Sequence, residues 1–268
     1  MQENDRVALV TGASTGIGLA TAKLLAACGY RVFGTSRRPR ENIDRVTMLA
    51  CDVTDTASVE AAVAAASQAG PIRLLVNNAG VGLLGGLEES SIAQAEDLFA
   101  VNLFAVIRAV KAVLPQMRAQ GEGRILNISS VLGFLPAPYS ALYAASKHAL
   151  EGLSESLDHE LRGFGIRVSL IEPAYTQTAF EANLVVPDTP LDAYAEARAN
   201  AQALMRDVMV QADPPELVAA AVLKAATARA PRHRYTVGKV ARQVSLLRRF
   251  VPEGAFDKSF RKQMRLPA

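Results

Sequence analysis

Short β-branched runs alternate along the chain with longer Ala- and Leu-rich runs of helical period. The expected strands are Arg6–Gly12, Arg31–Thr35, Val46–Val53, Arg73–Asn77, Arg124–Ser129, Arg167–Glu172 and Arg234–Gly238. Most are almost wholly apolar, as strands covered on both faces must be. The helical patterns between them include Ile17–Ala27, Ser58–Gln68, Ile92–Met117, Leu142–Arg162 and Pro215–Arg229. This alternation predicts an α/β fold, a doubly wound parallel sheet of about seven strands with helices on both faces.

The length of 268 residues allows one large domain or two small ones. Since no linker interrupts the alternation, we predict one domain over residues 1–268. Half of the residues are apolar and 21% are charged, which excludes a disordered chain. A net charge of +3 from 29 basic and 26 acidic residues is too small to indicate a nucleic-acid partner.

The two cysteines and the first residues bear on the compartment. Cys28 and Cys51 lie in apolar stretches and are expected to be buried free thiols in a reducing environment. The start, MQENDRVALVTG, does not resemble a signal peptide. We see no uninterrupted apolar run of about 18–20 residues, so we expect no transmembrane helix. These features favour a soluble, cytoplasmic protein.

A glycine-rich turn joins the first expected strand to the first helix. It reads Thr11-Gly12-Ala13-Ser14-Thr15-Gly16-Ile17-Gly18. Glycines let the backbone approach a pyrophosphate, and the helix N-terminus supplies free N–H groups and the positive end of a dipole. Taken alone, the pattern could also be a tight turn without a ligand.

The helical pattern Leu142–Arg162 carries two polar residues that its apolar stripe does not explain. The apolar stripe consists of Leu150, Leu153, Leu157 and Leu161. The acidic residues expected on the opposite side are Glu151, Glu155 and Asp158. Tyr143 and Lys147 are neighbours at i and i+4, on or at the edge of the apolar face. The ammonium of Lys147 is expected to lower the pKa of the Tyr143 phenol from about 10. This shift brings the phenol toward the range in which it can act as a general acid–base. The alternative is a core tyrosine beside a lysine that extends to solvent.

Together these residues resemble the short-chain dehydrogenase/reductase family. The turn matches its T-G-x-x-x-G-x-G pattern, Asn77-Asn78-Ala79-Gly80 matches N-N-A-G, and Tyr143-Ala144-Ala145-Ser146-Lys147 matches Y-x-x-x-K. The resemblance extends from about Val7 to Thr178 and implies a Rossmann-like fold. It also implies an oxidoreductase that transfers a hydride between nicotinamide and a ketone or secondary alcohol.

The resemblance assigns four catalytic residues. They are Asn102, Ser130, Tyr143 and Lys147. Tyr143 would exchange the proton on the substrate oxygen, and Ser130 would orient that oxygen. Lys147 would bind the nicotinamide ribose and tune the tyrosine. Asn102 would kink its helix and hold a water in a proton relay. No metal is expected.

The resemblance also implies a set of cofactor contacts. They are Gly12, Ser14, Thr15, Gly16, Ile17, Gly18, Ser36, Arg37, Asp52, Val53, Asn78, Ala79, Gly80, Tyr143, Lys147, Pro173, Thr176 and Thr178. Ser36 stands where NAD-preferring members carry an acidic residue, and Arg37 follows it, so NADP is favoured over NAD. The alternative is that Arg37, Arg38 and Arg40 only solvate a loop. Ala174 replaces a glycine of the family pattern, which leaves the local backbone open to question.

Two apolar segments without charged residues are expected to line the substrate pocket, at 81–87 and 131–139. They indicate an uncharged, lipophilic ketone or secondary alcohol, steroid-like or similar. About sixty residues separate the sixth and seventh strands, which suggests a substrate lid at 179–213. The lid could still bring Arg198 or Arg206 to the pocket.

The sequence also allows two alternative functions and self-association. The chain could be an NADP-binding sensor without turnover, although the intact catalytic set argues against this. The basic C-terminal segment, 242–265, could bind nucleic acid or a membrane surface, but we favour a solvated helix face and expect neither partner. The apolar faces of the helices at 92–117 and 142–162 would suit a homodimer or homotetramer.

Overall fold

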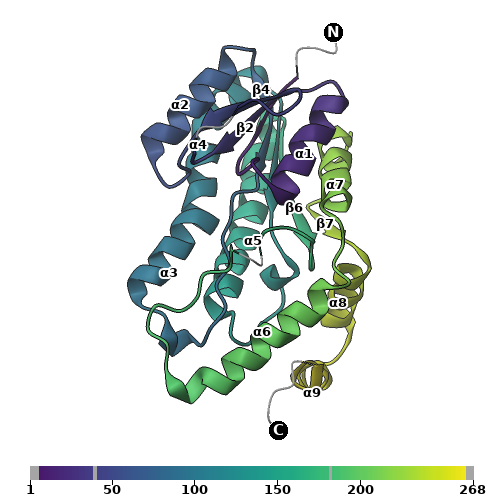
Figure 1. Cartoon of the computed structure of the whole chain (residues 1–268). Helices are drawn as coiled ribbons and strands as arrows, with labels where there is room; N and C mark the ends of the chain where they lie inside the picture. The colour runs from purple at the N-terminus through teal and green to yellow at the C-terminus, as the bar shows by residue number, and fades with distance from the viewer. Residues whose placement is uncertain (1–5, 39–40, 181–182, 264–268) are drawn as a thin grey trace.

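A computed structural model describes residues 6–38, 41–180 and 183–263, and a parallel sheet forms its centre (Figure 1). The strands are β1 (Val7–Val10), β2 (Arg31–Ser36), β3 (Val46–Ala50), β4 (Ile72–Asn77), β5 (Gly123–Ile128), β6 (Ile166–Pro173) and β7 (Arg234–Val237). Their spatial order is β3-β2-β1-β4-β5-β6-β7, and every pair of neighbours is parallel. The predicted seven-stranded, doubly wound architecture is therefore confirmed.

Helices cover both faces of this sheet. They are α1 (Gly16–Ala27), α2 (Thr56–Ser67), α3 (Ile92–Phe99), α4 (Ala105–Gln120), α5 (Ala141–Leu161), α6 (Ala195–Met209), α7 (Pro215–Thr227), α8 (Lys239–Phe250) and α9 (Glu253–Gln263). One core cluster joins α2, α4 and α5 to the sheet, and a second joins α1 and α7 to the opposite face. Figure 1 shows α1 and α7 together on one side and α2 and α4 on the other.

The helix expected at Ile92–Met117 is interrupted. A π-helical turn at Ala100–Phe104 separates α3 from α4. Within the described residues, the continuous stretch Ile92–Gln120 is the one helix that is long and apolar enough to cross a membrane. The search for an uninterrupted apolar run missed it, because a few polar residues are interspersed. Its apolar face packs on the sheet through α4, as a core helix of the same composition does.

Several local expectations are wrong. β1 ends at Val10 because Gly12 has a φ of +64° and starts the turn. β3 ends at Ala50, so Asp52 and Val53 lie in the loop after the strand. Cys28 follows the end of α1 and is exposed, whereas Cys51 is buried as expected.

The sequence pattern placed the acidic residues of α5 opposite its apolar stripe, but this side of the helix is not exposed to solvent. Glu151 and Asp158 are both buried, and they face β6 and β7. Asp158 accepts hydrogen bonds from Arg162 and Arg167 and from the Val168 backbone. The helix end differs too, because a 3-10 turn continues past Gly163 and the left-handed residue is Gly165, with φ +74°.

The segment between β6 and β7 folds back over the carboxyl ends of the strands. Val185 N donates to Gly82 O at 2.8 Å, and Arg198 of α6 pairs with the buried Glu89 carboxylate. α6 itself buries none of its described side chains completely, and it runs along the molecule toward α8 (Figure 1). This placement brings residues 183–198 onto the segment 81–91.

Candidate active site

The turn between β1 and α1 forms one side of the site. Gly12 and Gly16 have φ values of +64° and +56°, which glycine adopts without strain. A Cβ atom on Gly18 would lie 2.3 Å from Gly12 O, so the close approach of turn and helix requires glycine. The other predicted residues of the turn are partly or fully exposed: Ser14, Thr15 and Ile17.

The N-terminus of α1 is suited to an anion. Thr15 precedes the helix, and its side chain caps no N–H group of the described chain. The first turn, Gly16–Leu19, carries no carboxylate. The free N–H groups and the positive end of the helix dipole therefore fit the diphosphate of a dinucleotide.

The N-N-A-G segment begins at Asn77, the last residue of β4, and holds this turn by hydrogen bonds. The Asn78 side chain donates to Thr11 O at 2.9 Å and to Gly12 O at 3.0 Å. Thr11 Oγ1 accepts from the backbone N–H groups of Asn78 and Ala79. The Asn78 side chain is thus occupied in holding the backbone, and Ala79 and Gly80 remain partly exposed beside it. Sequence reasoning did not predict that Thr11 would hold this segment. The available signal was the position of Thr11 directly before the first glycine of the turn.

The predicted adenosine end lies after β2 and β3. Ser36 ends β2 and is partly buried, and Arg37 is exposed next to it. Asp52 is exposed and accepts from Thr54 N and Oγ1, while Val53 is buried. These hydrogen bonds, together with the charge of Arg37, lower the pKa of Asp52.

Tyr143 and Ser130 meet although they come from different elements. Ser130 follows β5, and Tyr143 lies in the first turn of α5. Burial raises the pKa of Tyr143 to about 12, and a hydrogen bond with the Ser130 side chain partly opposes this rise. The expected lowering of the Tyr143 pKa is therefore wrong for this structure. Its phenol is neutral at ordinary pH.

Lys147 lies one turn further along α5 and is buried. Its ammonium group donates to Ile128 O at 2.9 Å and is 5.8 Å from the centre of the Tyr143 ring. Burial lowers the pKa of Lys147 to about 8, and the Glu151 carboxylate acts in the opposite direction. A Cβ atom on Gly80 would be 3.9 Å from Lys147 Nζ, so the N-N-A-G segment reaches this group.

Asn102 lies in the π-helical turn and is buried. Its side chain accepts from Val81 N at 2.9 Å and donates to Val81 O at 2.9 Å and to Ser146 Oγ at 3.0 Å. Ser146 Oγ in turn donates to Tyr143 O at 2.7 Å. Asn102 therefore ties the helix to the end of the N-N-A-G segment and to α5. Ser146 escaped sequence reasoning, although it lies inside the Y-x-x-x-K pattern.

The segment after β6 closes the site over the glycine turn. Pro173 ends β6, and a Cβ atom on Gly16 would lie 3.1 Å from the Thr178 side chain. Thr176 Oγ1 is buried and has no hydrogen-bond partner among the described residues, so it is free for a ligand. Ala174 is not among the described residues with positive φ, so alanine in place of glycine causes no strain there.

A network of ion pairs joins α5, β6 and β7, and the sequence pattern did not predict it. The Ser129 hydroxyl donates to Glu151, and Arg234 of β7 binds Glu151, Glu155 and Glu172. Burial and the Glu151 charge raise the pKa of Glu172, and the Arg234 guanidinium opposes this rise. The partners come from α5, β6 and β7, and their separation along the chain hides the cluster from pattern analysis.

The segment expected to be a lid contacts Tyr143. The Phe180 ring lies 5.9 Å from the Tyr143 ring, centre to centre. Gly85 N donates to Tyr139 O at 2.7 Å, so the two predicted pocket segments touch each other. Cβ atoms on Gly82 and Gly85 would clash with Leu184 and Pro187, respectively. The site is thus bounded by apolar side chains on this side.

These features define a dinucleotide-dependent oxidoreductase site, and the comparisons agree. A family model described as short chain dehydrogenase matches residues 6–187. The chain therefore belongs to the short-chain dehydrogenase/reductase family, whose enzymes act on CH–OH and C=O groups with NAD or NADP.

Two curated relatives carry names that include a substrate. A 3-ketodihydrosphingosine reductase of Bacteroides thetaiotaomicron is 38% identical over 236 residues, which cover 87% of this chain and 88% of the relative. Retinol dehydrogenase 8 of Bos taurus is 39% identical over 199 residues, covering 69% of this chain and 64% of the relative.

Solved structures share the fold over most of the chain. A short-chain dehydrogenase from Streptomyces avermitilis superposes with a TM-score of 0.81 at 33% identity, covering 97% of this chain and 99% of the other. One from Burkholderia phymatum, in complex with NAD, gives 0.75 at 31% identity, covering 87% and 90%. A metagenomic short-chain oxidoreductase in complex with NADP gives 0.68 at 30% identity, covering 87% and 97%. Both cofactors thus occur among similar structures.

Proposed function

We propose that this enzyme transfers a hydride between NADP(H) and an uncharged, lipophilic ketone or secondary alcohol. The observation that carries the proposal is the meeting of Ser130, Tyr143 and Lys147, with Gly80 of the N-N-A-G segment next to the lysine. When bound, the nicotinamide supplies or accepts the hydride, and the protein contributes placement and electrostatics.

Each side chain has a defined task in this proposal. Tyr143, with its high pKa, donates a proton to the oxygen of the carbonyl that is being reduced. The Ser130 hydroxyl donates a hydrogen bond to the same oxygen as negative charge develops on it. Lys147 holds the nicotinamide ribose with its ammonium group. Asn102, through its hydrogen bond to Ser146, holds the π-helical turn against α5 for a proton relay.

The preference for NADP is supported by the end of β2. Residues Thr35–Arg38 contain no carboxylate that would repel a 2′-phosphate, and the exposed Arg37 can donate charge-assisted hydrogen bonds to it. Ser36 lies next to it at the strand end. The diphosphate would lie at the N-terminus of α1, with Thr176 and Thr178 toward the nicotinamide.

The lipophilic substrate class is supported by the boundary of the site and by the relatives. Arg198 does not bring a free charge to the pocket, because Glu89 neutralises it. Residues 82–85 contact apolar side chains of the segment after β6. The sphingosine and retinol names of the two relatives both denote lipophilic molecules.

We also propose that the chain is a single domain and that residues 179–213 act as its lid. Of these, residues 181 and 182 lie outside the described part of the chain. The contacts of Phe180 with Tyr143 and of Arg198 with Glu89 support a closed position over the substrate. A homodimer or homotetramer formed through α4 and α5 would leave this segment accessible. The exposed Phe104, next to α4, suits such an interface.

The test compares NADPH with NADH oxidation over a panel of hydrophobic ketones and small keto acids. We expect NADPH and the hydrophobic ketones to give the higher kcat/KM. Arg37→Ala should weaken NADPH use by about 10- to 100-fold without affecting NADH, as the loss of a charged hydrogen bond predicts. Arg38→Ala is the matched control. Faster turnover of keto acids, or NADPH binding with no turnover at all, would contradict the proposal.

A further inference from the structure

The outer face of α8 is unusual for the surface of this protein because it is apolar. Leu246, Leu247 and Phe250 are 59%, 50% and 71% exposed, and Val240 is 47% exposed. At about 100° per residue, the first three lie on the side away from Ala241, which is fully buried. One helix of twelve residues thus presents four large apolar side chains to solvent.

The opposite face of α8 fixes the helix to the body of the enzyme. Ala241 and Val244 pack in a small core cluster with Val131 and Leu135. This cluster belongs to the segment 131–139, which we expect to line the substrate pocket. The exposed apolar face is therefore held rigidly outward, close to the substrate side of the molecule.

The same helix carries only positive charge. Its sequence, KVARQVSLLRRF, contains Lys239, Arg242, Arg248 and Arg249 and no acidic residue. Lys239, Arg242 and Arg249 form no ion pair with any carboxylate of the described residues. Arg248 lies over the Phe256 ring of α9, at 5.4 Å, and Arg249 lies over the Phe250 ring of its own helix, at 5.5 Å. Without a carboxylate partner among the described residues, Lys239, Arg242 and Arg249 can bind an external anion.

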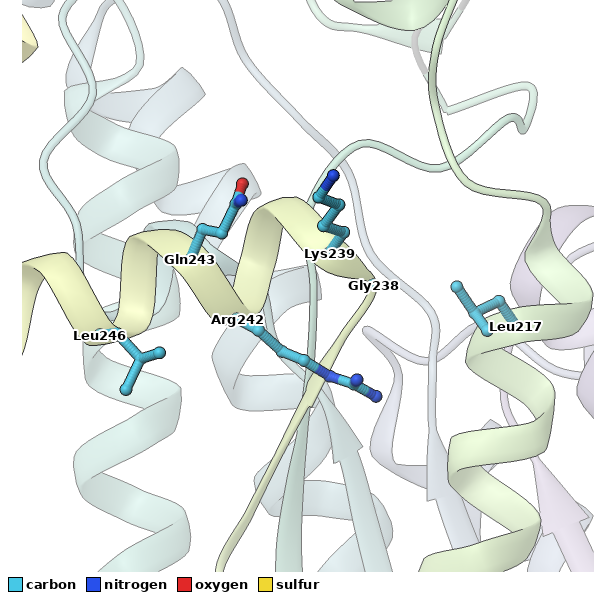
Figure 2. A pocket seen from close by; sticks show the side chains of 6 residues that line it. All are labelled: Leu217, Gly238, Lys239, Arg242, Gln243 and Leu246. Carbon is cyan, nitrogen blue, oxygen red and sulfur yellow. The ribbon is translucent and has the colours of Figure 1, made fainter.

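A cavity of about 380 Å³ lies next to the apolar face, between α7 and α8. Figure 2 shows Arg242 extending from α8 toward α7, where Leu217 lies, while Lys239 and Gln243 point to the other side of α8 in this view. The walls of this open hollow thus combine positive charge with apolar surface.

We propose that α8 binds the surface of an anionic lipid membrane. Leu246, Leu247 and Phe250 enter the boundary between headgroups and acyl chains, and Lys239, Arg242 and Arg249 contact the phosphates. Apolar burial and electrostatic attraction together define binding of this kind. Basic residues near an anionic surface add to this attraction. This surface departs from the solvated helix face expected from sequence, because exposure of the apolar residues was not visible in the pattern.

Charge and shape disfavour the other occupants. A symmetric contact between two copies through α8 would bring the same arginines toward each other. A nucleic acid would place its phosphates against three large apolar side chains. An anionic membrane satisfies both the apolar and the basic part of the face, and it is also where a lipophilic substrate would be dissolved.

The experiment measures co-sedimentation of the full chain with phosphatidylcholine vesicles that contain or lack phosphatidylglycerol. We expect binding to the anionic vesicles and its loss at high salt. Leu247→Gln/Phe250→Gln and Arg242→Gln/Arg249→Gln should each weaken binding by about tenfold or more. The matched controls are Ile92→Gln/Val210→Gln, at residues 76% and 80% exposed, and Arg118→Gln/Lys224→Gln, and these should bind like the wild type.

Three further measurements separate folding and self-association from lipid binding. Circular dichroism and NADPH binding should be unchanged in all variants, since none of these residues touches the proposed cofactor site. Light scattering reports the oligomeric mass. Equal vesicle binding by the wild type and both α8 variants would overturn the proposal. It would also be overturned if the wild type did not bind vesicles and the α8 variants differed from it in oligomeric mass. Since vesicle binding needs no turnover, this outcome is independent of the proposed reaction.

Discussion

The state of Tyr143 favours proton donation. Its pKa of about 12 keeps the phenol neutral, and a neutral phenol is the form that gives a proton to a carbonyl oxygen. The Lys147 ammonium donates to Ile128 O and lies 5.8 Å from the centre of the Tyr143 ring.

Lys147 should set the pH dependence of cofactor capture. Burial lowers its pKa to about 8, so the ammonium proposed to bind the ribose is lost as the pH rises through this value. We expect kcat/KM for NADPH, at saturating ketone, to be level at lower pH and then fall by about tenfold per pH unit. Lys147→Arg keeps its charge to much higher pH and should remove the fall. An unchanged fall in this variant would contradict the assignment.

Gly18 tests the cofactor turn. An added Cβ would lie 2.3 Å from Gly12 O and 2.4 Å from Asn78 Nδ2, so Gly18→Ala must displace the turn. NADPH affinity, measured by calorimetry, should fall by at least about tenfold, or 1.4 kcal/mol. The control is Gly152→Ala on α5, where a Cβ meets no atom within 4 Å and the helix gains up to about 1 kcal/mol. Equal affinity in both variants would show that the turn does not hold the cofactor.

At this scale the sequence predicts which residues meet but not their charge states. The i, i+4 spacing of Tyr143 and Lys147 is sufficient to make them neighbours, and the structure places them so. Their pKa values depend on burial by segments far along the chain. Sequence reasoning therefore assigned the wrong direction to the pKa of Tyr143.

At the scale of elements, α5 joins the active site to β6 and β7. Its first turns carry Tyr143 and Lys147, and its later turns carry Glu151 and Asp158, which bind arginines of both strands. A helical wheel assigns charged residues to the solvent side, so this second interface was misread. The arginine partners lie on other elements, and only the folded sheet brings them to the helix.

Asp158 should stabilise the fold in a pH-dependent way. Arg167, Arg162 and the Val168 N–H hold its pKa well below the ordinary value, although burial opposes them. Its contribution is therefore complete above about pH 4, the unfolded pKa, and is lost as the pH falls through the folded pKa. Asp158→Asn should lower the free energy of unfolding by about 3–5 kcal/mol at neutral pH, measured in urea.

The difference between Asp158→Asn and the wild type should shrink in acid. The exposed Glu160→Gln, on the same helix, is the control and should stay within about 0.5 kcal/mol of the wild type. A constant difference from neutral to acidic pH would show that the carboxylate charge does not contribute.

At the scale of the molecule, the long segment between β6 and β7 links the entrance of the proposed substrate pocket to the rest of the domain. The Glu89 carboxylate is fully buried, accepts from Gly86 N and Leu191 N, and pairs with Arg198. This group anchors the proposed lid to the end of the segment 81–91.

Arg198→Ala should release the lid, because it leaves the Glu89 carboxylate without its cation. We expect KM for the ketone to rise by about tenfold while NADPH affinity stays constant, since loss of a buried partner carries a large penalty. Arg206→Ala, exposed on the same helix, should change neither quantity. Steady-state kinetics and limited proteolysis of α6 provide the measurements. A normal KM in Arg198→Ala would argue against a lid.

The architecture of the whole molecule could be predicted because each strand and helix is encoded locally. The seven apolar runs correspond to the seven strands, and their alternation with helices requires a parallel sheet. The return of residues 183–198 onto 81–91 and the outward face of α8 could not be predicted. Both depend on long-range packing that leaves no period in the sequence.

The most direct test of the account is Tyr143→Phe, which removes one hydroxyl and keeps the ring that packs against Phe180. NADPH affinity should be unchanged, and turnover of the best ketone should fall by about 10²- to 10⁴-fold. A variant that binds NADPH and turns over at a near-normal rate would show that the Tyr143 phenol is not the proton donor.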